Sequence, residues 1–280
     1  MMKQMKQKMK LRWLPLLLLA ALLSGCAVRG GSPPALSAAP PTETTEATVR
    51  ITFPEGSTVV QMAEKLEANG VCAAAEFLAA ARDPAALEAQ GFGVDNAAER
   101  PFVCEGYVFP DTYDFYRGED AARALRRFLS NAAAKYDAEL LARCEAAGYT
   151  LDEILTLASI IQEEAGDPAE MPKVSAVLHN RMNSPDFPKL QCDVATVYLR
   201  EYVKPQVPAD AYDAYVERYN TYQCTGLPAG PITNPGMAAV NAALSPADTN
   251  DYFFLTDADG VYHYAETWEE HQENCARAGL

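Results

Sequence analysis

The chain has 280 residues, of which 38 are acidic and 23 are basic, so its formal net charge is −15. Residues 1–25 hold five basic side chains and no acidic one, so the remainder carries 18 − 38 = −20. This balance excludes a nucleic-acid-binding protein, because a phosphate backbone requires a basic surface. The hydrophobic content of 49% is that of a folded chain and excludes wholesale disorder.

The N-terminus predicts export from the cytoplasm. Residues 1–12 are basic, residues 13–23 are apolar, and Leu23-Ser24-Gly25-Cys26 closes the segment, which is the order of a secretory signal peptide. The last four residues resemble a bacterial lipobox, in which Cys26 would carry the lipid. A transmembrane span is the alternative, but the 28 − 12 = 16 uncharged residues before Arg29 would cover only about 24 Å of a roughly 30 Å core. Both hypotheses place the chain at the cell membrane, on its extracytoplasmic face.

Two segments follow the predicted signal. Residues 27–48 are rich in Pro, Ser, Thr and Ala and predict a disordered linker. Residues 49–100 begin with an alternating strand, and helices are predicted over 58–68, after a Ser57 cap, and over about 74–82. The order strand, helix, helix resembles a LysM-like module, a small fold that binds polymers containing N-acetylglucosamine. A structural spacer is the alternative.

Residues 101–280 are predicted to form the catalytic part, with mixed helices and short strands, so the expected fold class is α+β. They contain no Gly-rich phosphate loop, no G-x-S-x-G elbow and no H-E-x-x-H motif, and the three histidines lack metal-ligand spacing. We therefore expect no cofactor and no metal ion, which leaves carboxylate chemistry.

The helix predicted over residues 151–165 carries the candidate catalytic carboxylate. At about 100° per residue, Glu164 falls inside the apolar stripe, beside Leu157 and Ile160. A carboxyl group in apolar surroundings has a raised pKa and can donate a proton near neutrality. The alternative is a structural glutamate that pairs with Arg181.

The neighbouring glutamate has the opposite expected surroundings. Glu163 falls on the other side of the same helix, near Asp152 and Ser159, and all three are expected to face water. Two adjacent glutamates are thus predicted to have different roles.

Several motifs in one order resemble those of a known family. Residues 157–165, LASIIQEEA, are similar to the L-A-S-I-[IV]-E-[KR]-E-[AT] signature of the endolytic murein transglycosylases, the YceG-like family. The similarity covers about residues 50–275. Further segments that resemble the family are 105–113 (EGYVFPDTY), 172–181, 190–193 (LQCD), 219–222 (YNTY), 225–236 and a tail with 252–254, His263 and His271.

The resemblance assigns the catalytic role to Glu164 and implies that sugar-binding groups come from the same motifs. The earlier glutamate of the signature is Gln162 here, and Cys192 stands where the family usually has serine. Cys192 and Cys224 flank expected cleft motifs, which suggests a disulfide, with free thiols as the alternative. The candidate substrate-binding residues are Glu105, Tyr107, Asn180, Arg181, Gln191, Asp193, Tyr219, Asn220, Tyr222, Gly226, Leu227 and Pro228.

The activity that the resemblance implies is that of a lytic transglycosylase, a lyase of cell wall biogenesis. Such an enzyme cleaves the β-1,4 bond between N-acetylmuramic acid and N-acetylglucosamine in nascent peptidoglycan and leaves a 1,6-anhydro end. Glu164 would act first as acid and then as base. One alternative is an inactive peptidoglycan-binding lipoprotein, which Gln162 favours. The other is a hydrolytic muramidase that combines Glu164 with Asp193 or Glu105. The implied partners are glycan strands and membrane peptidoglycan synthases.

Overall fold

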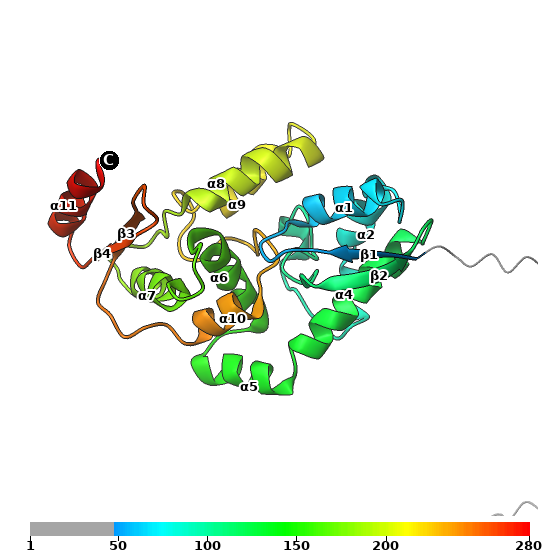
Figure 1. Ribbon diagram of the computed structural model, residues 1–280, viewed down its shortest axis with the longest axis horizontal. Helices are drawn as coiled ribbons and strands as arrows, with labels where there is room; N and C mark the ends of the chain where they lie inside the picture. The colour runs from blue at the N-terminus through cyan, green and yellow to red at the C-terminus, as the bar shows by residue number, and fades with distance from the viewer. Residues whose placement is uncertain (1–47) are drawn as a thin grey trace, which may run out of the picture. The chain divides into compact units, whose positions relative to one another are not determined.

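The computed structural model describes residues 48–280 (Figure 1). The predicted signal peptide, Cys26 and nearly all of the predicted linker lie outside the described residues. Residues 48–280 form helices and two small two-stranded sheets, so the predicted α+β class is confirmed. None of these helices has the length and apolar character that crossing a membrane requires. The elements are β1 (Thr48–Thr52), α1 (Val59–Ala68), α2 (Ala74–Ala81), α3 (Pro84–Glu88), η1 (Ala97–Glu99), β2 (Thr112–Tyr116), α4 (Ala121–Lys135), α5 (Ala138–Ala147), α6 (Leu151–Glu164), α7 (Met171–Met182), α8 (Asp193–Tyr198), η2 (Leu199–Val203), η3 (Lys204–Gln206), α9 (Tyr212–Tyr219), α10 (Met237–Leu244), β3 (Phe253–Thr256), β4 (Tyr262–Ala265) and α11 (Trp268–Ala278).

The first sheet joins segments from both sides of the predicted boundary at residue 100. β1 pairs antiparallel with β2 (Figure 1). In this pairing Val49 lies opposite Phe115. The ring of Phe53 lies edge-on to Phe128 of α4, with centroids 5.0 Å apart, and to Phe115 at 6.2 Å. These aromatic contacts hold α4 against the sheet. Between the two strands lie α1, α2, α3 and η1. The second strand comes from residues that were predicted to belong to the catalytic part.

α1 begins one residue later than predicted. The hydroxyl of Thr58, not Ser57, accepts a hydrogen bond from the Gln61 amide at 3.2 Å, and the Gln61 side chain accepts one from the Thr58 amide at 2.9 Å. This reciprocal capping box closes the helix. The Ser57 hydroxyl donates instead to the Pro54 carbonyl at 2.7 Å, so the predicted cap is wrong by one position.

α6 is the buried helix that positions the candidate site. A capping box at Thr150 closes its N-terminus, and α7 and α10 lie against it (Figure 1). Residues 154–161 are all buried, so the middle of the helix has no side that faces water. Ser159, predicted to face water, is 0% exposed, and its hydroxyl accepts a hydrogen bond from the Ile232 amide at 3.0 Å. That prediction is wrong because the segment around Ile232 covers this side of α6.

The C-terminal hairpin is joined to the end of α7. β3 and β4 pair antiparallel, and α11 packs against both strands. The side-chain amide of Asn180 donates to the carbonyls of Thr249 and Asp251, each at 2.9 Å. The Nε of Arg181 donates to the Tyr252 carbonyl at 2.7 Å. These bonds fix β3 beside α7 and bring the hairpin to the end of α6.

Candidate active site

Glu164, the last residue of α6, lines an open cavity of about 340 Å³. The walls come from four further segments: the end of α7, the turn before α8, the loop after α9, and β3. Five predicted site residues therefore meet in one place. The lining residues are Glu164, Arg181, Gln191, Cys192, Asp193, Tyr222, Phe254, Leu255 and Thr256.

The surroundings of Glu164 suit a group that both donates and accepts a proton. Burial, together with a smaller contribution from the nearby charge of Asp193, raises the pKa of Glu164 to about 7. A hydrogen bond from Cys192 and the positive charge of Arg181 act in the opposite direction. The carboxyl group is then about half protonated at neutral pH, which is the condition under which one residue can serve as general acid and general base.

Arg181 does not neutralise Glu164. Its guanidinium donates to the carbonyls of Tyr252 and Leu190 and lies over the ring of Phe253, 5.6 Å from the centroid. Within residues 48–280, Glu164 has no ion pair closer than 4.0 Å. The alternative of a structural glutamate locked to Arg181 is therefore not what the structure contains. Arg181 instead holds together two walls of the cavity.

The turn before α8 is strained and heavily supported. Gln191 has φ +55°, the one positive value among the non-glycine residues of the described chain, and such a conformation costs about 1–3 kcal/mol. Hydrogen bonds to Thr221 stabilise this strained conformation. Its carbonyl accepts from the Gln191 amide at 3.0 Å, and its hydroxyl accepts from the Cys192 amide and donates to the Cys192 carbonyl, both at 2.9 Å. Thr221 was not among the predicted site residues, although it lies between two of them.

Tyr222 and Asp193 form the solvent-facing part of the cavity. The Tyr222 hydroxyl donates to Asp193 Oδ1 at 2.7 Å, and 43% of Tyr222 is exposed. Asn220 supports this loop, because its side-chain oxygen accepts from the Tyr222 amide at 2.9 Å. Of the three predicted tyrosines, Tyr222 is the one whose ring remains open to a sugar. Tyr107 and Tyr219 are each only 1% exposed and pack against other aromatic rings.

Glu105 lies in a buried hydrogen-bond network, not in the wall of the Glu164 cavity. One oxygen accepts from the Val59 amide at 2.9 Å and from the Asn234 side-chain amide at 2.8 Å. The other accepts from the Tyr198 hydroxyl at 3.3 Å. Burial raises the pKa of Glu105 to about 8. The network ties the start of α1 to the segment before α10.

The remaining predicted residues lie elsewhere. Gly226, Leu227 and Pro228 line a separate open cavity of about 550 Å³ that follows the N-terminal half of α6. Asn180 is used in the two backbone contacts that anchor β3. Their roles in substrate binding stay predictions.

Glu163 is exposed, in agreement with the helical wheel. Its carboxylate is nevertheless packed close to Gly56 and accepts a hydrogen bond from Thr233. Burial of this carboxylate raises the pKa of Glu163, because the carboxylate lies against neighbouring residues while other atoms of the residue face the solvent. The two adjacent glutamates therefore point in different directions, and only Glu164 reaches the cavity.

The suggested disulfide between Cys192 and Cys224 is absent. All cysteines of residues 48–280 are free thiols. Cys192 is buried, its thiol lies against the carboxylate of Glu164, and it contacts the Leu190 carbonyl at 3.6 Å. The disulfide prediction is wrong for this structure because the Cys192 side chain points into the site.

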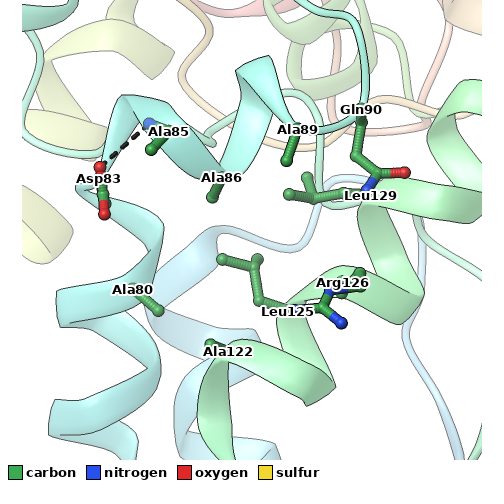
Figure 2. A pocket seen from close by; sticks show the side chains of 10 residues that line it. All are labelled: Ala80, Asp83, Ala85, Ala86, Ala89, Gln90, Ala122, Leu125, Arg126 and Leu129. Carbon is green, nitrogen blue, oxygen red and sulfur yellow. Dashed lines mark hydrogen bonds between the residues drawn. The ribbon is translucent and has the colours of Figure 1, made fainter.

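A further cavity, of about 250 Å³, lies between α2, α3 and α4 (Figure 2). Its walls are mainly alanine and leucine side chains. Of its polar residues, Asp83 is engaged in capping α3, where it accepts from the Ala85 amide at 3.0 Å. This cavity offers no free acid or nucleophile, so it is a poor candidate for chemistry. Within residues 48–280, no group of three or more His, Cys, Asp or Glu side chains could hold a metal ion.

Comparison with known proteins agrees with the sequence motifs. An endolytic murein transglycosylase of Bacillus subtilis (strain 168) is 33% identical over 174 residues, which cover 60% of this chain and 46% of that protein. The protein of the same name from Streptococcus pneumoniae serotype 2 (strain D39 / NCTC 7466) is 26% identical over 247 residues, covering 81% and 44%. This chain thus spans less than half the length of these curated relatives.

The crystal structure of a putative yceG-like protein from Listeria monocytogenes has the same fold. It superposes with a TM-score of 0.68 at 26% identity, covering 81% of this chain and 75% of that one. The model of the YceG-like family matches residues 35–277. Because this match extends over most of the sequence, the chain belongs to the YceG-like family.

Proposed function

We propose that this protein is an endolytic lytic transglycosylase of peptidoglycan. It would cleave the β-1,4 bond between N-acetylmuramic acid and N-acetylglucosamine, leave a 1,6-anhydro end and so release or terminate nascent glycan strands. The observation that carries the proposal is Glu164, a carboxyl group with a pKa of about 7 on the wall of an open cavity, which has no ion-pair partner among residues 48–280. The names of the relatives, which are murein transglycosylases, support it.

In the first step, protonated Glu164 donates its proton to the glycosidic oxygen. The bond from C1 to that oxygen breaks, and an oxocarbenium-like state forms on the muramic acid ring. The nearby carboxylate of Asp193 is suited to stabilise the positive charge that develops there. The leaving strand departs with a new hydroxyl group.

In the second step, the Glu164 carboxylate takes the proton from the C6 hydroxyl of the same ring. The C6 oxygen attacks C1 and closes the 1,6-anhydro ring. The proton returns to Glu164, so one residue completes the cycle and no water is consumed. A group with a pKa near the working pH is the most effective in such a double role.

A hydrolytic muramidase is the second candidate, because Asp193 supplies another carboxylate in the same cavity. Glu105 is a poor choice for that second carboxylate, since both of its oxygens are used in the buried network. The inactive binder is less well supported. Gln162 accepts a hydrogen bond from the Gly236 amide at 3.0 Å and does not line the cavity, so its replacement of a glutamate removes no group from the site.

The mass of the reaction products distinguishes these candidates. Purified protein is incubated with uncrosslinked glycan strands, and the new ends are analysed by mass spectrometry. We expect muramic acid ends that are lighter by one water than reducing ends. Reducing ends would identify a muramidase and contradict the proposal. Unchanged strands, in an assay where a known lytic enzyme cleaves the same batch, would indicate a binding protein.

We also propose that residues 48–116, which run from β1 through α1, α2, α3 and η1 to β2, form a LysM-like module that binds N-acetylglucosamine-containing strands. The predicted strand and two helices are present as β1, α1 and α2, and β1 pairs with β2, which supports the proposal. Titration of isotope-labelled protein with chitooligosaccharides should shift amide resonances within residues 48–116. Shifts confined to the Glu164 cavity would make this unit a spacer.

For the cell, we propose an extracytoplasmic location at the membrane, with a lipid on Cys26, and association with membrane peptidoglycan synthases. The lipobox-like sequence and the family membership support it. A diacylglyceryl group found on Cys26 by mass spectrometry of detergent-extracted protein tests the anchor. In-cell crosslinking tests the synthases.

A further inference from the structure

The backbone at Glu164 needs support from outside its own helix. The last carbonyl groups of any α-helix lack intrahelical donors, and its last turn frays easily. The amide of Ala165 makes the final helical bond, to the Ile161 carbonyl at 2.9 Å, and the chain then turns into an extended conformation at Ala165, with φ −108° and ψ 99°. The candidate catalytic residue thus lies in the last turn of α6, where the backbone carbonyl groups have no helical donor.

A tyrosine of the C-terminal hairpin supplies this support. The hydroxyl of Tyr262 donates to the backbone carbonyl of Glu164 at 3.1 Å and accepts from the amide of Gly166 at 2.9 Å. One hydroxyl group therefore bridges the residues on both sides of the point where the helix ends. It satisfies a carbonyl that α6 cannot satisfy itself.

The same hairpin also forms a wall of the cavity. Tyr262 begins β4 and pairs with Thr256 of β3. Phe254, Leu255 and Thr256 of β3 line the cavity together with Glu164. The position of the carboxyl group relative to this wall is thus determined by an element that touches both.

We propose that Tyr262 is a positioning residue for Glu164, which fixes the last turn of α6 so that the carboxyl group stays directed into the cavity. The expected effect on the rate of cleavage rests on the proposed function, whereas the effect on the position of the carboxyl group does not. Tyr262 does not line the cavity and is not required to contact the substrate. A small displacement of a reacting group can lower a rate by about 10²-fold, so even a partial loss of this support is measurable.

Tyr264 provides a matched control. It lies two residues along the same strand, its ring stacks on that of Tyr262 with centroids 6.2 Å apart, and its hydroxyl donates to Glu170 Oε2 at 2.9 Å. Tyr264→Phe thus removes the same atom and one hydrogen bond from the same face of β4. It leaves the backbone of Glu164 untouched.

The experiment compares Tyr262→Phe with Tyr264→Phe in glycan cleavage. We expect Tyr262→Phe to lower kcat by about tenfold and to change KM less than twofold, whereas Tyr264→Phe stays within twofold of wild type. Both variants should unfold at similar temperatures. Equal rates for the two variants, or equal losses that follow a loss of stability, would overturn the assignment.

A second measurement keeps the inference separate from the enzymatic proposal. The side-chain carboxyl resonance of Glu164 is observed in carbon-13-labelled protein and is assigned by its disappearance in Glu164→Gln. In Tyr262→Phe we expect this resonance to broaden or divide, and in Tyr264→Phe to remain single. An inactive wild-type protein would contradict the proposed function, while an unchanged resonance in Tyr262→Phe would contradict the positioning role.

Discussion

Replacing Glu164 with glutamine should lower the rate of glycan cleavage by about 10²–10⁴-fold, the usual contribution of a general acid or base. The amide keeps the shape of the side chain but neither donates an acidic proton nor accepts one from the C6 hydroxyl. The fold should persist. Because burial raises the pKa of Glu164, its charged form disfavours the folded state above neutral pH, and the variant should be at least as stable as wild type at pH 8. Product analysis and thermal unfolding at that pH measure the two effects.

Glu163→Gln is the adjacent control. Its carboxylate lies near Gly56 and Thr233 and not in the cavity, so cleavage should stay within about twofold of wild type.

The rate of cleavage by the wild-type protein should fall above about pH 7, where Glu164 loses the proton needed for the first step. The rate measured across a pH series checks this, and so do the rates of the Glu164→Gln and Glu163→Gln variants. Equal losses in the two variants would mean that the structure assigns the catalytic role to the wrong glutamate.

The sidedness of α6 was predictable because helical periodicity is a local property. It separated Glu164 from Glu163 without knowledge of the neighbouring elements. The same periodicity failed for Ser159. A helical wheel has one apolar and one polar side, and it contains no information about the segment around Ile232, more than seventy positions along the chain, that covers the polar side.

The motifs located the cavity but did not separate its lining from its framework. Gln191, Asp193 and Tyr222 line the cavity, whereas Tyr107 and Tyr219, from equally clear motifs, are core residues. A motif marks a position where the fold needs a particular side chain, and packing decides whether that side chain reaches the substrate.

The residues that sequence reasoning missed act through the backbone. Thr221 supports the strained turn at Gln191, and Tyr262 supports the end of α6. Such contacts depend on which loop meets which helix end. Local patterns do not encode this, because the partners are far apart in the chain. The same holds for Cys192, which stands where the family usually has serine. Its thiol lies beside Glu164 because the fold brings the two residues together, although they are far apart in the chain.

Replacing Glu105 with glutamine should make the protein less sensitive to alkaline pH. Glu105 is 1% exposed, and its pKa is raised to about 8 by burial, with a smaller contribution from the charge of Glu163. A group whose pKa is higher in the folded state contributes stability below its unfolded pKa of about 4.3, and that contribution is lost as the pH rises towards 8. The loss amounts to roughly 3–5 kcal/mol. Denaturation of wild type and Glu105→Gln at pH 5 and pH 8.5 measures it.

At pH 5 the two proteins should have similar free energies of unfolding, and at pH 8.5 the variant should be the more stable. The amide oxygen can still accept from the Val59 amide and the Asn234 side chain, and the amide nitrogen can donate to the Tyr198 hydroxyl oxygen. Glu105→Ala is the contrasting variant. It removes the acceptor of three buried donors and should cost about 2–4 kcal/mol at pH 5 as well. A Glu105→Gln variant that is less stable at both pH values would mean that the network requires the carboxylate charge.

The position of this network explains why its loss should also affect cleavage. The side-chain amide of Asn234 donates one hydrogen bond to Glu105 and another to the carbonyl of Ser57, just before α1. Two residues further along the chain, the Gly236 amide donates to Gln162, which lies on α6 two residues before Glu164. Glu105 therefore connects the start of α1 to α6, the helix that carries the candidate catalytic carboxyl group. Activity that survives unchanged in a folded Glu105→Ala protein would show that α6 holds its position without this connection.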